Sequence, residues 1–397
     1  MTIGAAKSGV LIRIVDQGFW SAAFFLSNLA IAADLDVQEF AFYSTILAIV
    51  LVAVAVNRSA GVDSQIIANA RNKISSATGI DRSSVWMTSA GLFLFLFAGI
   101  LLVSLINRVP SYPFLLSVCV WAGAVLLGDV QHYYLVIMRA RFHAALVSIL
   151  YFVSISTALG VCHWLELDAM PSVAVGAAAH ACVAGVVTAS ARLPSAKRRI
   201  QGRLALGLGL ESLYVSVGSQ LGPLILFAAG LAAPTAGLRL AYSAVYSPVF
   251  AVIQALYPLL LLRVLDESVS GSSSRRTMLR WSAFVFISTG AFATIGWVII
   301  PHIELIPLLI NSLEFLVPVG LSFVGAQMLE VGLLSKRLIW NPVRMNMLRL
   351  ASVSLEMVLQ VLGVLFAGVD GLIVCMTSIG VLKLALAAWL LRRGGRS

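Results

Sequence analysis

The stretch Arg192-Leu-Pro-Ser-Ala-Lys197-Arg198-Arg199-Ile-Gln-Gly-Arg203 divides the chain into two apolar halves. There are 191 residues before it and 194 after it, and each half is a series of apolar segments separated by short polar breaks. A hydrophilic segment with five positive charges between equal apolar halves is typical of a cytoplasmic linker between two lobes. The alternative is an ordinary basic loop in an asymmetric helical bundle, which equal lengths alone do not exclude.

The composition indicates a membrane protein. The chain is 60% hydrophobic and 11% charged, with a mean hydropathy of +0.98, whereas a soluble domain carries about 25% charged residues. The formal net charge of +10 is explained by cationic loops that set membrane orientation, so no nucleic-acid partner is expected. The four cysteines lie inside apolar segments without CxxC spacing, which predicts neither a disulfide nor a zinc site.

A helix needs about 20 apolar residues to cross the hydrocarbon core of a bilayer. Twelve such segments are expected, at 14–33, 40–57, 85–106, 114–137, 146–165, 172–191, 205–230, 237–262, 281–300, 312–334, 348–367 and 371–391. The predicted fold class is therefore an all-α polytopic membrane protein with about twelve transmembrane helices in two six-helix lobes. The N-terminal lobe is expected at 1–191, the cytoplasmic basic linker at 192–204 and the C-terminal lobe at 205–397.

Positive charge is distributed unevenly between the two sets of loops. When the N-terminus and every second loop are assigned to the cytoplasm, 24 of the 27 lysines and arginines lie on that side. Because cytoplasmic loops are enriched in Lys and Arg, both termini of this multi-pass protein are expected in the cytoplasm. No GxGxxG, Walker A, HExxH or GxSxG pattern is present. We therefore expect no enzymatic activity, no catalytic residue, no cofactor and no metal.

Polar and ionisable residues occur at membrane depth in the first and fourth spans. With about 100° of rotation per helical residue, one face of the first span carries Arg13, Asp16, Gln17, Trp20, Phe24, Ser27 and Asn28. This stripe either lines a hydrophilic cavity or forms hydrogen bonds where the helix packs against its neighbours. In the fourth span, one face carries Asp129, His132, Arg139 and His143. Such a group is either a proton- or ion-responsive site or a structural ion-pair network.

The seventh and eighth spans combine charge with helix breakers. Glu211 lies in the seventh span, where Gly222-Pro223 is expected to interrupt the helix. Arg239 lies one turn inside the outer end of the eighth span, so snorkelling to the lipid headgroups is the simple alternative to a functional role. Pro248, near the middle of this span, predicts a kink. The backbone carbonyl that loses its helical hydrogen bond there must accept one from another polar group.

The last two spans carry opposite charges at matched depth. Glu356 is seven residues from Arg349, and Lys383 is nine residues from Arg392. Both charges therefore lie about 10–14 Å from the inner end of their helices. Because an unpaired charge is costly inside a membrane, the sequence predicts an ion pair between Glu356 and Lys383.

Several short motifs resemble those of polysaccharide flippases. In the expected eighth span they are Gly237-Leu-Arg239-Leu-Ala-Tyr242 and Ser247-Pro248. In the first half they are Asp16-Gln17, Asp36-Val-Gln-Glu39-Phe40-Ala-Phe-Tyr43, Gly128-Asp129 and Arg139-Ala-Arg141. With these motifs and its hydropathy, the chain resembles the MOP (multidrug/oligosaccharidyl-lipid/polysaccharide) exporter superfamily, in its polysaccharide (Wzx-type) flippase branch.

This resemblance implies two lobes around a central cavity that opens alternately to each side. It implies outward transport of an undecaprenyl-diphosphate-linked oligosaccharide across the inner membrane for surface polysaccharide assembly. Membrane lipids and glycan-assembly proteins would then be partners. By position, Arg13, Asp16 and Arg239 match cavity charges of flippases, and Arg58 is a weaker match. The chain lacks two C-terminal spans of the peptidoglycan-precursor flippases, which argues against that branch.

The primary hypothesis is therefore a flippase for a lipid-linked saccharide, because the arginine fork binds phosphate oxygens bidentately. Its candidate substrate-binding residues are Arg13, Asp16, Arg239 and Arg58. The first alternative is a cation-coupled small-molecule exporter. The candidate residues for ion or proton coupling are Asp129, His132 and Glu211, with Asp16 as a further carboxylate. The second alternative is a non-transporting membrane subunit of a glycan-assembly complex. A cationic cavity favours the anionic lipid, and a carboxylate-rich cavity favours the exporter.

Overall fold

A computed structural model describes residues 3–65, 80–107, 111–138, 140–191, 202–249, 252–253, 275–303, 306–334 and 342–392 of the protein. The regular structure of these residues is entirely helical. The chain forms two compact units, Met1–Gln220 and Leu221–Ser397, which are described separately below. The division between them falls inside a helix, while residues 192–201 of the predicted basic linker lie outside the described residues.

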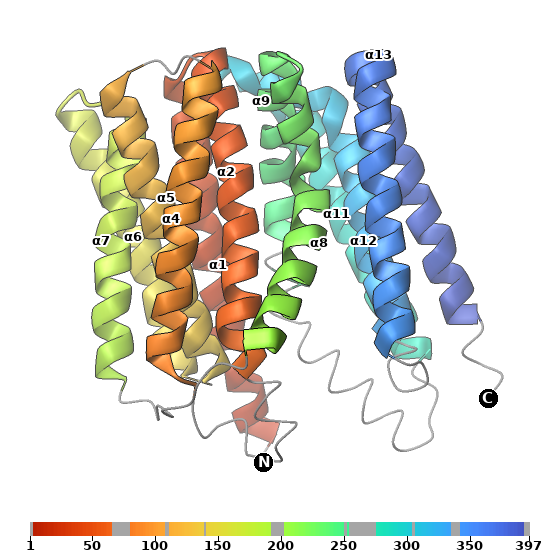
Figure 1. Ribbon diagram of the computed structural model, residues 1–397, viewed down its shortest axis with the longest axis horizontal. Helices are drawn as coiled ribbons and strands as arrows, with labels where there is room; N and C mark the ends of the chain where they lie inside the picture. Colours follow the sequence, from red (N-terminus) through yellow and green to blue (C-terminus); the bar gives the residue numbers. More distant parts are fainter. Residues whose placement is uncertain are drawn as a thin grey trace. The chain divides into compact units, whose positions relative to one another are not determined.

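The first unit is a bundle of long helices (Figure 1). Its helices are α1 (Ile3–Asp34), α2 (Val37–Asn57), α4 (Arg82–Asn107), α5 (Tyr112–Ile137), α6 (Arg141–Trp164), α7 (Ala169–Ser190) and the first part of α8 (Gly202–Ala228). A π-helical segment, η1 (Arg58–Asp63), continues α2 without a break. Helix α5 packs along α7, and α1 packs along α6, so the first, fourth, fifth and sixth spans lie together.

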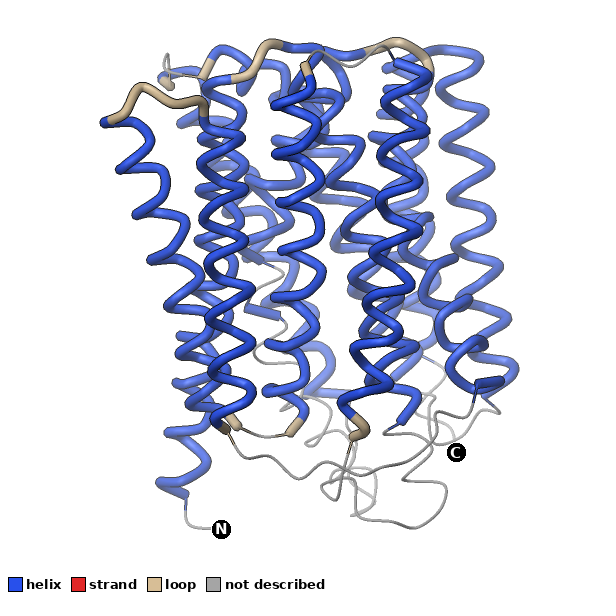
Figure 2. The backbone as a smooth tube through the Cα atoms, turned by 60° about the vertical axis from the view of Figure 1, so that its left-hand side comes forward, coloured by secondary structure: helices blue, strands red, loops and turns tan. Residues whose placement is uncertain are grey.

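The second unit begins with the end of α8. It contains α9 (Ala232–Ala241), the π-helical η3 (Tyr242–Tyr246), α11 (Arg275–Ile299), the short η4 (Ile300–His302) and η5 (Pro307–Ser312), α12 (Leu313–Leu334) and α13 (Pro342–Arg392). Ala367 and Gly368 have non-helical dihedral angles and divide α13 into the two spans predicted at 348–367 and 371–391. Within each unit the helices run in a similar direction, with loops at their ends (Figure 2).

Local sequence signals start several of these helices. Asp36 accepts hydrogen bonds from the backbone N–H groups of Gln38 and Glu39, both at 2.8 Å, and so caps α2 after a two-residue turn. Ser111 caps α5 in the same way, with Pro113 in the first turn. These caps place α2 and α5 at fixed starting points, and both helices are buried over much of their length.

Among the described residues, nine stretches are long and apolar enough to cross a membrane, and one of them covers both halves of α13. Helix α1 is not one of these nine, because Asp16, Gln17 and Asn28 make it less apolar than they are. The described part of α9 and η3 is short because most of residues 250–274 lie outside the described set. With these two, the protein is an all-α polytopic membrane protein of twelve spans, as predicted.

Two expectations about individual helices were wrong. Gly222-Pro223 does not interrupt the seventh span, because α8 continues through Pro223 to Ala228. A proline inside a helix removes one backbone hydrogen bond, and membrane helices tolerate this loss where neighbouring groups satisfy the freed carbonyl. The four-residue face expected on the fourth span was also wrong: α5 ends at Ile137, in agreement with the predicted bounds 114–137, and His143 belongs to α6, so the four residues do not share one helix surface.

Pro248 lies two residues after the end of η3, so the helix irregularity in the eighth span takes the form of a π-helical turn before the proline. Such turns are frequent at functional sites. Residues 254–274, which include the expected end of this span and the polar segment after it, lie outside the described residues.

Candidate functional site

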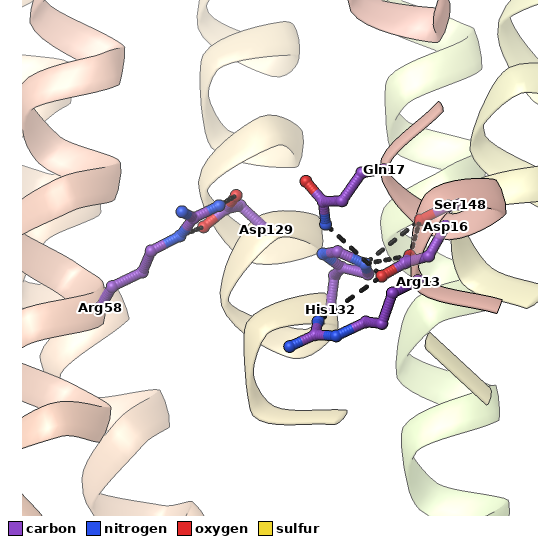
Figure 3. A network of polar contacts seen from close by, with 7 residues as sticks. All are labelled: Arg13, Asp16, Gln17, Arg58, Asp129, His132 and Ser148. Carbon is purple, nitrogen blue, oxygen red and sulfur yellow. Dashed lines mark hydrogen bonds and ion pairs between the residues drawn. The ribbon is translucent and has the colours of Figure 1, made fainter. Parts of the chain in front are cut away.

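A buried carboxylate lies at the centre of the first unit. Asp16, on α1, has no exposed surface. The Nε2 atom of His132, on α5, lies 2.7 Å from Asp16 Oδ1, and the Ser148 hydroxyl, on α6, donates a hydrogen bond of 2.6 Å to the same oxygen. We call these three residues the Asp16 cluster. Figure 3 shows His132 and Ser148 converging on the Asp16 carboxylate.

Two residues of α1 approach the other carboxylate oxygen. Gln17 donates a hydrogen bond of 3.4 Å to Asp16 Oδ2, and Arg13 Nη1 lies 3.9 Å from it. The Arg13 side chain is 23% exposed, whereas that of Asp16 is completely buried. Arg13 and Asp16, which share the predicted polar face of the first span, are therefore in contact, but this contact is long, and the shorter contacts of Asp16 come from α5 and α6.

Aromatic rings surround His132. The Trp20 ring stacks on the imidazole with a centroid distance of 4.4 Å and an interplanar angle of 13°. Tyr151 and His180 pack against Trp20 at 5.0 Å and 5.5 Å, and against each other at 4.3 Å. His132 Nδ1 and both ring nitrogens of His180 are buried and have no hydrogen-bond partner among the described residues. The cluster is thus enclosed by closely packed rings.

A second ion pair joins Asp129, which is also on α5, to Arg58 of η1. Asp129 is bound by both ends of the Arg58 fork: Nε donates to Oδ2 at 2.8 Å, and Nη2 donates to Oδ1. The Arg58 guanidinium carbon lies 5.0 Å from the Tyr133 ring centroid, and the Tyr133 hydroxyl donates to Asp63 at 2.8 Å. Arg58 and Asp63 are the first and last residues of η1.

The predicted coupling residues therefore belong to two different contacts. Asp129 and His132 are three residues apart on α5, yet they point in different directions, Asp129 to Arg58 and His132 to Asp16 (Figure 3). Arg139 lies outside the described residues, and His143 is at the start of α6. Asp129 and His132, which were predicted to belong to one cluster, thus form two separate pairs, each with a partner on another helix.

The remaining predicted site residues lie on α8 and α9. Glu211 is half-buried on the part of α8 that belongs to the first unit. Arg239 is 4% exposed in α9, which packs closely against η5 in the second unit. This burial differs from the snorkelling alternative, in which the guanidinium would reach the lipid headgroups.

Sequence analysis did not identify Ser148, Tyr151 or His180 as site residues. Their partners are far away in the chain: Ser148 is 132 residues from Asp16. The available signal was weak, because a single serine or histidine in an apolar span is common. Ser148 and Tyr151 are one helical turn apart on α6, so a shared face was the one hint that the sequence offered.

The second unit contains the predicted ion pair. Lys383 Nζ donates to Glu356 Oε2 at 2.6 Å, and both side chains are less than 10% exposed. Gln360 Nε2 lies 3.4 Å from Glu356 Oε1. The contact joins the two halves of α13, and the prediction of this pair is confirmed. In the described part of the chain, no three His, Cys, Asp or Glu residues are placed to hold a metal ion.

No protein-family model and no curated protein matches the chain. Solved structures match over nearly all of it. A mutant of the Vibrio cholerae MATE transporter VcmN is 14% identical, with a TM-score of 0.61 and coverage of 98% of this chain and 96% of that one. An outward-facing MATE family transporter of the MOP superfamily is 11% identical, with a TM-score of 0.68 and coverage of 98% and 96%. The chain has the fold of these transporters.

The lipid II flippase MurJ, in an inward closed conformation, has the same fold. It is 10% identical, with a TM-score of 0.60 and coverage of 96% of this chain and 87% of the flippase. The fold expected from the resemblance is therefore confirmed, whereas membership of the MOP superfamily and of its polysaccharide branch stays a prediction. Identities of 10–14% establish the shared fold and no more.

Proposed function

We propose that the protein is a MOP-type transporter that moves an undecaprenyl-diphosphate-linked saccharide to the outer leaflet of the bacterial inner membrane. The observation that carries this proposal is the fold, which extends over 96% of the chain in the comparison with a lipid II flippase. The substrate class agrees with the resemblance of the eighth-span motif Gly237-Leu-Arg239-Leu-Ala-Tyr242 to that of polysaccharide flippases.

Arg13 is the residue of the first unit that best suits a diphosphate. The Arg58 fork is occupied by Asp129, whereas the contact of Arg13 with Asp16 is long, at 3.9 Å, and part of the Arg13 side chain stays exposed. A guanidinium in this position can turn its N–H groups to phosphate oxygens without breaking a short hydrogen bond. Arg239 is proposed as the contact from the second unit.

The test compares Arg13→Ala with Arg13→Lys and with Arg280→Ala as a control, because Arg280 is an exposed arginine of α11. Losing one charge-assisted contact of about 1.5–3 kcal/mol should slow transport by about 10- to 100-fold. Lipid-linked saccharide should then accumulate in the inner leaflet of cells with Arg13→Ala, with Arg13→Lys intermediate because it keeps the charge and loses the fork.

Normal transport by Arg13→Ala would remove Arg13 from the substrate contact. Arg239 is tested as Arg239→Lys, because a truncation at a buried position risks the fold itself. The amount of inserted protein, measured in the same membranes, separates loss of transport from loss of protein.

The second candidate function is a cation-coupled exporter of small molecules. The fully buried carboxylate of the Asp16 cluster favours it, since a buried group that changes charge is suited to coupling, and the matched folds include MATE transporters. Inverted vesicles distinguish the two functions: an exporter accumulates a cationic dye on energisation, and a flippase turns over lipid-linked saccharide without moving the dye. A non-transporting subunit would do neither.

The same proposal includes the cellular setting. We infer a location in the bacterial inner membrane with both termini in the cytoplasm, membrane lipids as surroundings and glycan-assembly proteins as partners. The excess of lysine and arginine in one set of loops supports this orientation.

A further inference from the structure

Three helix ends of the first unit meet at Arg82. Arg82 is the first residue of α4, Tyr134 lies in the last turn of α5, and Thr188 lies in the last turn of α7. Arg82 Nη2 donates a hydrogen bond to the Thr188 carbonyl oxygen, and the guanidinium carbon lies 5.2 Å from the centroid of the Tyr134 ring. These two contacts fix the guanidinium at the end of the unit where α4 begins (Figure 1).

Each of these three residues has a buried donor atom without a hydrogen-bond partner among the described residues. The atoms are Arg82 Nε, the Tyr134 hydroxyl oxygen and the Thr188 hydroxyl oxygen. Tyr134 is 3% exposed and Thr188 is 8% exposed. Leaving a buried polar atom without a partner is costly, so three such atoms around one arginine indicate a binding site.

The chemistry of the three groups selects an anion. All three can donate a hydrogen bond, and Arg82 adds a positive charge. Among the described residues, no carboxylate forms an ion pair with Arg82. The neighbouring carboxylate, Asp81, accepts hydrogen bonds from the hydroxyls of Ser83 and Ser84 instead. A guanidinium with additional donors suits the oxygens of a phosphate group.

The next turn of α4 places these groups at the membrane surface. Trp86, one turn after Arg82, is 43% exposed, and Met87 beside it is 76% exposed. Exposed tryptophan is typical of the level of the lipid headgroups. The Arg82 side chain is itself partly exposed, so a phosphate at this level can reach it. The loops predicted on this side carry the excess of lysine and arginine, and such basic segments attract anionic lipids.

We propose that Arg82, Tyr134 and Thr188 bind the phosphate group of an anionic glycerophospholipid from the leaflet next to the basic loops. The phosphate oxygens accept hydrogen bonds from the guanidinium and from the two hydroxyls. One headgroup then links the start of α4 to the ends of α5 and α7, and the lipid is a structural ligand of the first unit. This binding does not depend on the proposed transport function.

The experiment measures thermal unfolding of the purified full-length protein in lipid-free detergent. The probes are dioctanoylphosphatidylglycerol, dioctanoylglycerol, which has the same chains without phosphate, and inorganic phosphate. A ligand that binds the folded state raises its stability with the logarithm of the ligand concentration above the Kd. We expect the phospholipid to stabilise the wild-type protein and the other two probes to have little effect at the same concentration.

Two conservative variants test the site itself. Tyr134→Phe keeps the ring under Arg82, and Thr188→Val keeps the backbone carbonyl, so each removes one unpaired hydroxyl. Each should weaken the affinity for the phospholipid about tenfold, because a hydrogen bond to a charged group is lost. The matched control is Arg280→Gln, which changes an exposed arginine of α11 and should keep the wild-type affinity.

Four results would overturn the proposal. An unchanged affinity in Tyr134→Phe and Thr188→Val would mean that the hydroxyls do not contact the phosphate. A loss of stability in these variants without lipid would mean that the hydroxyls already have partners within the protein. Equal stabilisation of the wild-type protein by dioctanoylglycerol would show that only the acyl chains are recognised. Equal stabilisation by inorganic phosphate would assign the site to the free ion in place of a lipid.

Discussion

At the scale of single residues, each unit contains a close pair of opposite charges that joins two spans. Arg58 with Asp129 in the first unit and Lys383 with Glu356 in the second join charges from different spans. Removing one partner of such a pair leaves an uncompensated charge in a low-dielectric interior, which is more destabilising than losing both. The pairs therefore fix which faces of the helices meet.

The pair in α13 gives a direct prediction. Lys383→Met should destabilise the protein by about 3–5 kcal/mol, because it strands Glu356 in the interior. The exchange of Glu356→Lys with Lys383→Glu should recover part of the folded yield, measured by thermal unfolding in detergent. The control is Arg349→Ala: its partner Glu330 is 39% exposed, so the loss should be about 0–1 kcal/mol. Additive losses in the exchanged protein would show that the two side chains do not interact.

The sequence predicted this pair but not the partners of Asp16 or Asp129. Glu356 and Lys383 lie on consecutive spans, so their depths can be counted from the same membrane surface. Asp16 and His132 are 116 residues apart, and Arg58 and Asp129 are 71 apart. Depth alone allows several partners for each of these residues, and the choice depends on which helices pack together.

At the scale of the helix, the start of α4 is stabilised by one acidic residue. Asp81 precedes Arg82 and accepts hydrogen bonds from Ser83 Oγ at 2.7 Å and from Ser84 Oγ at 2.6 Å. Partial burial opposes ionisation of this carboxyl, but the hydrogen bonds from Ser84 and Ser83 outweigh it and lower its pKa. A lowered pKa in the folded state stabilises the helix start at neutral pH, and this stabilisation is lost as the pH falls through that value.

We therefore predict that Asp81→Ala weakens the first turn of α4 by about 1 kcal/mol. Asp81→Asn should retain most of the cap, because asparagine caps about as well as aspartate, but it should lose the dependence on pH. Hydrogen exchange of the first turn of α4 at neutral and acidic pH measures both effects. Equal exchange in the wild-type protein and in Asp81→Ala would mean that another group satisfies the helix start.

The twelve spans could be predicted because each requires a long apolar segment, and the break at Gly368 was visible from the charged Asp370 between two apolar segments. Other features depend on packing. Pro223 remains helical in α8, and α2 continues as a π-helix to Asp63. Hydropathy does not encode which backbone groups a neighbouring helix can satisfy, so these two departures could not be foreseen.

At the scale of the whole molecule, the boundary between the two compact units differs from the basic segment that was predicted to link two lobes. The compact units separate at Gln220 and Leu221, inside α8. Near its start, α8 packs on η1, where a Cβ at Gly209 would lie 3.3 Å from Ala60 Cβ. Further along, a Cβ at Gly222 would lie 3.0 Å from Leu238 Cδ2 of α9. The seventh span thus contributes to the packing of both units, which a linker defined by composition does not reveal.

The orientation in the membrane is the last prediction. With 24 of 27 lysines and arginines assigned to one side, the loop between α8 and α9 should face outward and the end of α7 inward. Cysteines are introduced at Ala229, which is exposed in that loop, and at Ser190, which is exposed at the end of α7, in a protein whose four native cysteines are replaced. Ser273 provides a second inner position outside the described residues.

An impermeant thiol reagent should label Ala229→Cys in intact cells, whereas Ser190→Cys and Ser273→Cys should be labelled only after lysis. Ala229 is preferred to Pro234, which is half-buried in α9 and would react slowly on either side. Labelling of both Ala229→Cys and Ser190→Cys from outside would require an even number of spans between them, instead of the single span α8. The reverse pattern would place the termini outside and would contradict the charge rule itself, because the basic loops would then have crossed the membrane.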